Sequence, residues 1–350
     1  MSIDKIFSGG VTCIQKSETA ISGGFEDLIL IILDQCSIES GDLKVIKSFE
    51  GEIFSEFIIL IDGSTYSLKL TFDSENESFM NEVSFLKENK KNISLPYINS
   101  GLLDFSLKVK FLLARYENVF ELKDFGSNLL MDETDLFLIA VSLLNNCKSE
   151  KSSEDYINMF FSNHDCYNSL LYDKCESSGF GIKYSEFCSV MDKIRKEIEN
   201  SEKLESIKGQ ITCHGLMVSE NLILKDGLFK FKNLNYNFLG NPLFDLAFLC
   251  VSFSLKNDNR LLLLKKYCDF FNFDFRELKK DYDDCIYIAS CLFLYKNFFD
   301  LFVSLTVKNE NFDTASSAHN ISRSLKYFKK LPFYNEFKVL FEEITEESEE

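Results

Sequence analysis

The stretch HGLMVSENLIL at residues 214–224 determines how the rest of this chain is interpreted. It begins with a His-Gly pair, continues to Asn221 and ends in a short apolar run that predicts a strand. Downstream, GNPLFDLA at residues 240–247 carries Asp245 where an apolar helical segment begins. A buried Asp at a helix start can accept hydrogen bonds from loop N–H groups. Gly215 fits a tight turn in this loop.

The region before this loop has a β-rich pattern. Two runs of β-branched and aromatic residues flank Asp62-Gly63, a dipeptide typical of two-residue hairpins because both residues tolerate positive φ. Alternation through the second run, residues 65–72, places Lys69 on the face opposite the apolar side chains. An amphipathic helix is predicted over residues 77–89 and carries Glu82, and VKFLLA at residues 109–114 predicts a buried strand.

The remaining pattern is mainly helical after residue 115. Helices are predicted over 134–144, 153–161 and 184–205, and again between 244 and 341, with a β-hairpin at 222–234 built on Asp226-Gly227. Residues 25–36 fit either a buried helix or a short strand. The acidic C-terminal tail is predicted to be frayed.

Composition excludes several functional classes. The chain has 350 residues and a formal net charge of −17, which repels phosphate backbones and argues against nucleic acid as a partner. Its 11 cysteines are odd in number and include no C-x-x-C, which argues against a disulfide framework and a zinc site. The apolar run at 28–33 is too short for a membrane span, and no export signal is recognisable. A cytoplasmic protein is the expectation.

The two polar stretches resemble H-G-D-x-x-x-x-N and G-[DN]-P-x-x-D-L-A, the motifs of the aminoglycoside phosphotransferase and choline kinase-like family. This resemblance implies an α+β, bilobal protein-kinase-like fold with a small β-rich N-lobe and a larger, mainly helical C-lobe. The expected division is an N-terminal extension over 1–40, the N-lobe over 41–115, the C-lobe over 116–340 and the acidic tail over 341–350.

The resemblance also implies roles for particular residues. His214 and Asp245 match residues that, in the family, brace the catalytic loop and do not react. Lys69 and Glu82 resemble the ion pair that holds the nucleotide phosphates, and Asn221 matches an Asn that binds Mg²⁺. The second metal-binding position of the family, an Asp, corresponds to Asn233, with Asn235 as the rival alignment. The implied cofactor is ATP, with Mg²⁺ bound weakly or not at all.

The chain departs from the family at the positions that carry the chemistry. Leu216 stands where the loop Asp orients the acceptor hydroxyl, and a leucine can neither accept a proton nor form a hydrogen bond through its side chain. Asn233 replaces a carboxylate that a hard cation prefers, and residues 228–243 contain no Asp or Glu. The expected phosphate-covering turn, SFEGEIFS at 48–55, holds one glycine and two glutamates, which repel phosphate.

These departures favour a pseudokinase, inactive or nearly so, that acts by binding a partner, with or without a nucleotide. An alternative is an active phosphotransferase for an alcohol or amino-alcohol, or an enzyme of nucleotidyl transfer, that uses a carboxylate from elsewhere in the chain. A third hypothesis is a structural or assembly protein that has inherited the fold. The sequence does not identify a partner or substrate.

Overall fold

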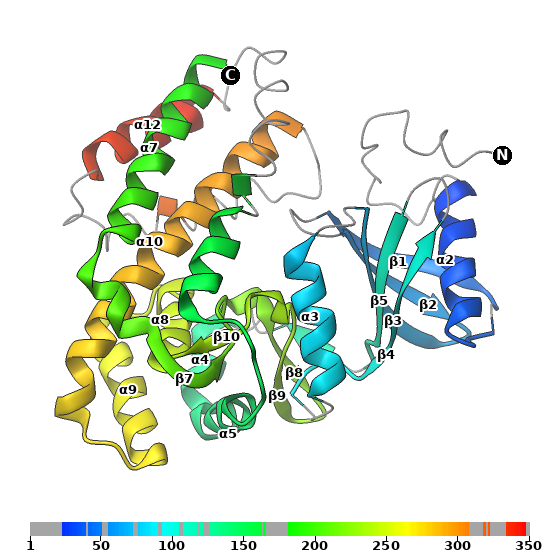
Figure 1. Ribbon diagram of the computed structural model, residues 1–350, viewed down its shortest axis with the longest axis horizontal. Coiled ribbons are helices and arrows are strands. Elements are labelled where there is room, and N and C mark those ends of the chain that lie inside the picture. Colours follow the sequence, from blue (N-terminus) through cyan, green and yellow to red (C-terminus); the bar gives the residue numbers. More distant parts are fainter. Residues whose placement is uncertain are drawn as a thin grey trace.

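A computed structural model of the chain describes residues 23–39, 41–50, 55–72, 76–89, 93–104, 108–117, 119–121, 126–162, 164–165, 181–307, 318–319, 321–322 and 334–347. The smaller, β-rich part and the larger helical part lie side by side in Figure 1.

The N-lobe is built on a five-stranded antiparallel sheet. Its strand order is β1-β2-β3-β5-β4, with β1 Leu43–Glu50, β2 Ser55–Ile61, β3 Ser64–Thr71, β4 Tyr97–Asp104 and β5 Lys108–Arg115. The predicted hairpin is confirmed, because Ile61 pairs with Ser64 across Asp62 and Gly63, whose φ angles are 46° and 85°. Strand β4 was not predicted. It is an edge strand whose side chains are mostly half-exposed, so it lacks a clear apolar alternation.

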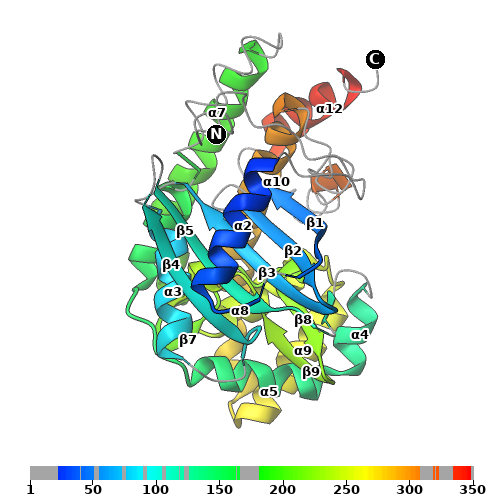
Figure 2. The same cartoon turned by 90° about the vertical axis from the view of Figure 1, so that its right-hand side faces the viewer.

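Two helices flank this sheet on opposite faces. Helix α2, Gly23–Gln35, covers the outer face, whereas α3, Glu77–Glu88, lies on the side of the C-lobe (Figures 1 and 2). The open alternative at residues 25–36 is therefore a helix. Ile29, Ile32 and Leu33 are fully buried in one hydrophobic cluster with the sheet. Spacings of three and four residues place these side chains on one helix face.

The C-lobe is mainly helical and includes small β-elements. Its elements are β6 Val119–Glu121, α4 Gly126–Asp132, α5 Thr134–Asn145, a helix over 153–162, α7 Gly181–Glu199, β7 Lys208–Cys213, β8 Leu222–Lys225, β9 Leu228–Phe231, β10 Phe238–Gly240, α8 Leu243–Ser252, α9 Asn257–Phe271, α10 Phe275–Val307 and α12 Tyr334–Glu347. Short 3₁₀ turns lie at η2 Glu202–Ile207, η3 Ser219–Asn221 and η4 Leu234–Tyr236.

The segment after β5 connects the two lobes. Strand β6 pairs with β8 of the C-lobe hairpin, and the turn of that hairpin has positive φ at Asp226 and Gly227, as predicted. The main core combines C-lobe helices with Phe79, Val83 and Leu86 of α3. Helix α3 is therefore packed against both lobes, and its position relative to the C-lobe is fixed by apolar burial.

One prediction about a helix end was wrong. The helix predicted over 184–205 ends at Glu199, and the Ser201 side chain accepts a hydrogen bond from the N–H of Lys203 to begin η2. A Ser at this position favours a new cap over helix continuation. Helix α12 extends to Glu347 in the acidic tail, and buried Phe337 and Leu340 hold its first half against the core.

Among the residues that the structure describes, no helix combines the length and the apolar character that crossing a bilayer requires.

Helix α2 offers a matched test of its contribution to stability. Ile32 is fully buried and the adjacent Ile31 is 41% exposed. We expect Ile32→Ala to lower the free energy of unfolding by about 2–5 kcal/mol, because it leaves a cavity under the sheet. Ile31→Ala is the control and should change stability by less than about 1 kcal/mol. Urea denaturation measures both, and equal losses would contradict the described packing of α2.

Candidate functional site

The ion pair expected from sequence is formed within the N-lobe, between β3 and α3. Lys69 of β3 is 5% exposed and Glu82 of α3 is 2% exposed. The Lys69 Nζ donates to both carboxylate oxygens of Glu82, at 2.8 and 2.9 Å. Glu82 Oε1 also accepts the backbone N–H of Leu234 at 3.2 Å, so the pair contacts the segment that follows β9. Buried charges are stable only when they are paired and hydrogen-bonded, and both conditions hold here.

The two asparagines of the proposed metal site extend this pair into a chain of hydrogen bonds. Lys69 Nζ donates to Asn233 Oδ1 at 2.7 Å, and Asn233 Nδ2 donates to Asn221 Oδ1 at 2.7 Å. Asn221 Nδ2 in turn donates to the carbonyl oxygen of Leu216 at 2.9 Å. Asn233 has φ 56° and ψ 53°, a left-handed conformation that Asn tolerates better than most residues. The chain of contacts runs from the N-lobe sheet to the catalytic-type loop.

This arrangement uses, for internal contacts, the groups to which the family resemblance assigns the nucleotide and its metal. An ammonium has three N–H donors, and Lys69 makes three hydrogen bonds to Glu82 and Asn233. Both amide oxygens, those of Asn233 and Asn221, already accept hydrogen bonds, one of them from the lysine cation. A cation bound to Asn233 Oδ1 would lie beside a positive charge. Over the described residues, no group of three or more His, Cys, Asp or Glu side chains could hold a metal ion.

The loop at residues 214–216 is braced as the sequence suggested. Asp245 accepts the N–H of His214 at 2.6 Å and the N–H of Gly215 at 2.9 Å. Burial raises the pKa of Asp245 to about 7, while its two N–H donors act in the opposite direction and favour the anion. Gly215 has φ 83°, and a Cβ there would lie 2.2 Å from the Tyr236 carbonyl oxygen. Tyr156 donates its hydroxyl to the Gly215 carbonyl at 2.8 Å.

His214 is held as a neutral ring. Burial, and to a lesser extent the nearby Lys69 charge, lowers the pKa of His214 to about 4. Its Nε2 lies 2.9 Å from the Lys232 carbonyl oxygen, and its Nδ1 lies 3.3 Å from the N–H of Leu216. The neutral tautomer with the proton on Nε2 satisfies both contacts, because it donates to the carbonyl and accepts from the N–H. His214 therefore positions the loop.

Leu216 is part of the C-lobe core. Its side chain is 7% exposed and belongs to the same hydrophobic cluster as Met217 and Val218. Only its backbone joins the polar network, by accepting from Asn221. An aspartate at this place in the present packing would need new hydrogen-bond partners.

A carboxylate that the sequence analysis missed also lies on the cleft face of the sheet. Glu56 of β2 pairs in register with Lys69, is 5% exposed, and accepts the Ser67 hydroxyl at 2.6 Å. The signal was present in the sequence. A two-residue turn at Asp62-Gly63 fixes the register, and this register places Glu56 opposite Lys69 on the same face.

The space beside the ion pair is small. A cavity of about 20 Å³ is lined by Lys69, Glu82, Leu112, Phe231 and Lys232, among others. That volume suits one water molecule, whereas pockets for small ligands typically span about 300–1,000 Å³. The segment at 51–54, where the phosphate-covering turn was expected, lies outside the described residues.

Helix α3 is held to the C-lobe by further polar contacts. Asn81 Nδ2 donates to the Asn235 carbonyl at 2.7 Å, and Asn89 Oδ1 accepts the N–H of Lys148 at 2.8 Å. Asn235, the rival alignment for the metal position, contributes its backbone here and has a buried side chain. The residue that bridges the side chains of Lys69 and Asn221 is Asn233.

Comparison with known proteins connects this geometry to one group of folds. No protein-family model and no curated protein sequence matches the chain. Among solved structures, an ethanolamine kinase from Plasmodium vivax is similar, with a TM-score of 0.54 and 13% identity, over 90% of this chain and 89% of that one. The choline kinase LicA from Streptococcus pneumoniae has a TM-score of 0.52 and 12% identity, over 86% and 98%.

A third similar structure is the aminoglycoside phosphotransferase APH(4)-Ia in its apo form. Its TM-score is 0.51 at 12% identity, over 85% of this chain and 98% of that one. At such low identities the likeness shows the fold. The predicted α+β, bilobal architecture is confirmed, and the chain has the kinase-like fold of the aminoglycoside phosphotransferases and the choline and ethanolamine kinases.

Proposed function

We propose that this chain is a pseudokinase, which keeps the kinase-like scaffold but does not transfer a phosphoryl group by the usual route. It acts by binding a partner, with or without a nucleotide. The observation that carries the proposal is the chain of hydrogen bonds from Glu82 through Lys69 and Asn233 to Asn221. The chain uses the ammonium and both amide oxygens for internal contacts.

The absence of carboxylates at positions 216 and 233 also argues against phosphoryl transfer. Phosphoryl transfer depends mainly on positioning and on neutralising the charge of the phosphates. Leu216 supplies no side-chain acceptor for a substrate hydroxyl, and Asn233 supplies an amide in place of a charge. Removal of a single catalytic group commonly lowers kcat by several orders of magnitude. Two such losses at one centre leave almost no catalysis by the usual route.

A nucleotide is the small ligand that the fold makes plausible. The choline kinase LicA has been solved in complex with AMP, and that structure matches this chain with a TM-score of 0.50 and 15% identity, over 86% and 96% of the two chains. Binding here would require Lys69 to exchange its contact with Asn233 for a phosphate oxygen. We therefore propose at most weak binding of ATP, with little or no dependence on Mg²⁺.

Glu56 supports a second candidate function. It is a buried carboxylate on the cleft face, opposite Lys69, and so could replace a missing acidic group in an active phosphotransferase or nucleotidyl transferase. Its Oε1 already accepts the Ser67 hydroxyl. Glu56 also lies on β2 of the N-lobe sheet, whereas the loop with Leu216 belongs to the C-lobe. The pseudokinase proposal is therefore preferred.

Restoring the two carboxylates tests the proposal. In the native chain, the melting temperature should shift by less than about 1 °C between ATP with EDTA and ATP with Mg²⁺ or Mn²⁺, because the side-chain oxygens of Asn221 and Asn233 already accept hydrogen bonds and carry no charge for the metal. The variant with Leu216→Asp and Asn233→Asp should gain a metal-dependent shift of several degrees, compared with its own ligand-free value. Differential scanning fluorimetry over a range of ATP concentrations gives both numbers.

A matched control separates site effects from added charge. Leu228 is 42% exposed, and Asn272 is a second asparagine with positive φ, so Leu228→Asp with Asn272→Asp repeats the chemistry elsewhere. This control should gain no metal-dependent shift. A metal-dependent shift in the native chain, together with nucleotide turnover that Glu56→Gln abolishes, would replace the proposal by the second candidate. A double variant without any gain would refute the assigned positions.

A further inference from the structure

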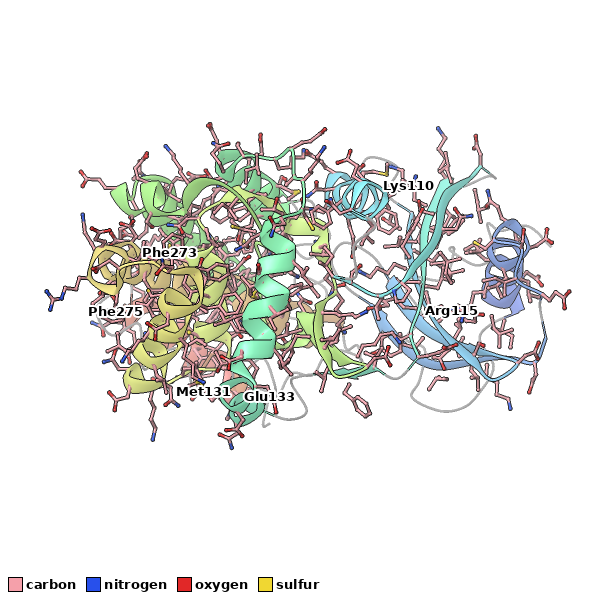
Figure 3. The ribbon with its side chains drawn as sticks, turned by 90° about the horizontal axis from the view of Figure 1, so that it is seen from below. Lys110, Arg115, Met131, Glu133, Phe273 and Phe275 are labelled. Carbon is pink, nitrogen blue, oxygen red and sulfur yellow. The ribbon has the colours of Figure 1, made fainter. Side chains whose placement is uncertain are left out.

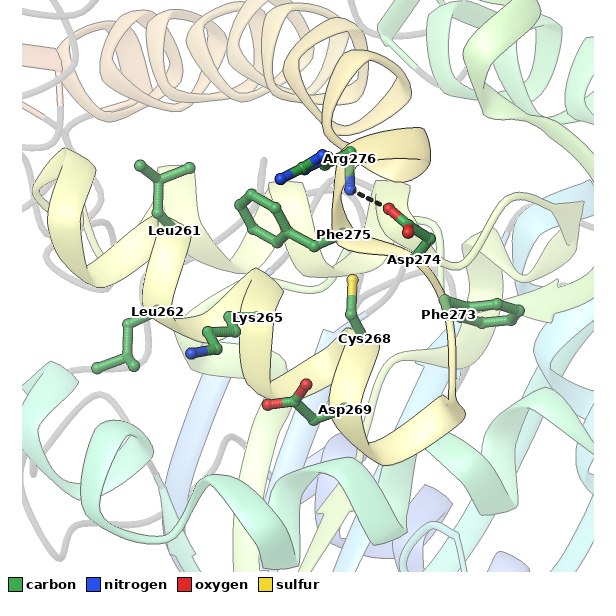
Figure 4. Close-up of a pocket in the computed structure, with 9 residues that line it drawn as sticks. All are labelled: Leu261, Leu262, Lys265, Cys268, Asp269, Phe273, Asp274, Phe275 and Arg276. Carbon is green, nitrogen blue, oxygen red and sulfur yellow. Dashed lines mark hydrogen bonds between the residues drawn. The ribbon is translucent and has the colours of Figure 1, made fainter.

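A wide hollow on the surface of the C-lobe lies away from the Lys69–Glu82 ion pair. It has a volume of about 650 Å³ and lies between α9 and the turn into α10 (Figure 4). Figure 3 shows Phe273 and Phe275 at the end of the molecule opposite Lys110 and Arg115 of the N-lobe sheet. The hollow therefore belongs to a surface separate from the candidate site around Lys69 and Asn233.

Its apolar part is unusually exposed. Leu262 is 46% exposed, Phe273 is 48% exposed and Phe270, on the same stretch, is 43% exposed. Phe273 stacks on Tyr267 and Phe271, so its ring has a fixed apolar support. Leu262 and Phe273 both line the hollow, and exposed apolar side chains that gather at one place are candidates for a contact surface.

The hollow is lined by equal numbers of basic and acidic side chains. Lys265, Asp269 and Arg276 make no ion pair with any residue that the structure describes. Asp274 accepts the N–H of Arg276 at 2.7 Å and so caps α10. Two basic and two acidic side chains thus line the hollow, although the whole chain has a net charge of −17. A strongly charged partner of either sign would meet like charges here.

The order of these residues along the chain is self-complementary. From the N-terminal end of α9 it runs apolar Leu262, basic Lys265, acidic Asp269 and apolar Phe273. Leu262, Lys265 and Asp269 project from one side of the helix, as Figure 4 shows. When two copies of α9 lie antiparallel about a two-fold axis near Tyr267, Lys265 of one copy faces Asp269 of the other. Leu262 then lies beside Phe273 of the other copy.

We propose that this surface, formed by Leu262, Lys265, Asp269, Phe273 and Arg276, binds a second copy of the chain in a two-fold symmetric dimer. A two-fold contact uses the same patch on both partners, so the patch must complement itself in charge and in apolar character. This surface meets both conditions. The local charge balance also lets two molecules with a large net negative charge approach each other here. This inference does not depend on the proposed function.

The oligomeric state of the full chain tests the proposal. Sedimentation velocity over a series of protein concentrations should show a monomer–dimer equilibrium. Leu262→Glu and Phe273→Glu should each raise the dimer dissociation constant at least tenfold, because each places a charge in an apolar contact. Val339→Glu is the matched control. Val339 is 52% exposed on α12, away from the hollow, and its substitution should leave the constant unchanged.

Charge reversal makes the test specific to the antiparallel contact. Lys265→Glu alone and Asp269→Lys alone should each weaken self-association, because each places like charges opposite each other. A mixture of the two variants should form a heterodimer, since both contacts between positions 265 and 269 then join opposite charges. Retained circular dichroism spectra and melting temperatures establish that the variants are folded. A native chain that stays monomeric at all concentrations, or equal association by native chain and Leu262→Glu, would overturn the proposal, as would a mixture that remains monomeric.

Discussion

One ammonium group connects the two lobes of this molecule. Lys69 extends from the N-lobe sheet, pairs with Glu82 on α3 and donates to Asn233 of the C-lobe. A buried lysine is costly unless its charge is paired and its protons are all bonded. The positions of β3, α3 and the segment after β9 are therefore constrained together, and the apolar packing of α3 on the C-lobe core supports the same arrangement.

The identity of residue 233 determines whether this group of hydrogen-bonded side chains could also bind a cation. A carboxylate at position 233 would offer a cation a negative charge and a second oxygen. The amide of Asn233 instead donates through Nδ2 to Asn221 and continues the series of hydrogen bonds from Lys69. Strand β3, helix α3 and the segment after β9 are thereby held together by side chains of the protein itself. Asp245 and neutral His214 still brace the loop, because their hydrogen bonds to backbone groups do not depend on catalysis.

Much of the fold and of the candidate site could be predicted from local features of the sequence. The two Asp-Gly turns, the helix with Glu82 and the strand with Lys69 follow from periodicity and positive φ, and the braced loop follows from its Gly and Asp. The edge strand β4 and the break after Glu199 depend on tertiary exposure and on a cap, which periodicity does not encode. The bond between Lys69 and Asn233 joins residues 164 positions apart, so no local pattern could reveal it.

The coupling between Lys69 and Asn233 is the most direct test of the central claim. A double-mutant cycle with Lys69→Gln and Asn233→Ala, measured by urea unfolding in the native background, isolates this contact, because the cost of removing the lysine from Glu82 occurs in both variants that carry Lys69→Gln and cancels. A buried hydrogen bond from an ammonium should give a coupling free energy of about 1.5–3 kcal/mol. A coupling below about 0.3 kcal/mol would show that the two side chains act independently and would contradict a closed chain of contacts between the lobes.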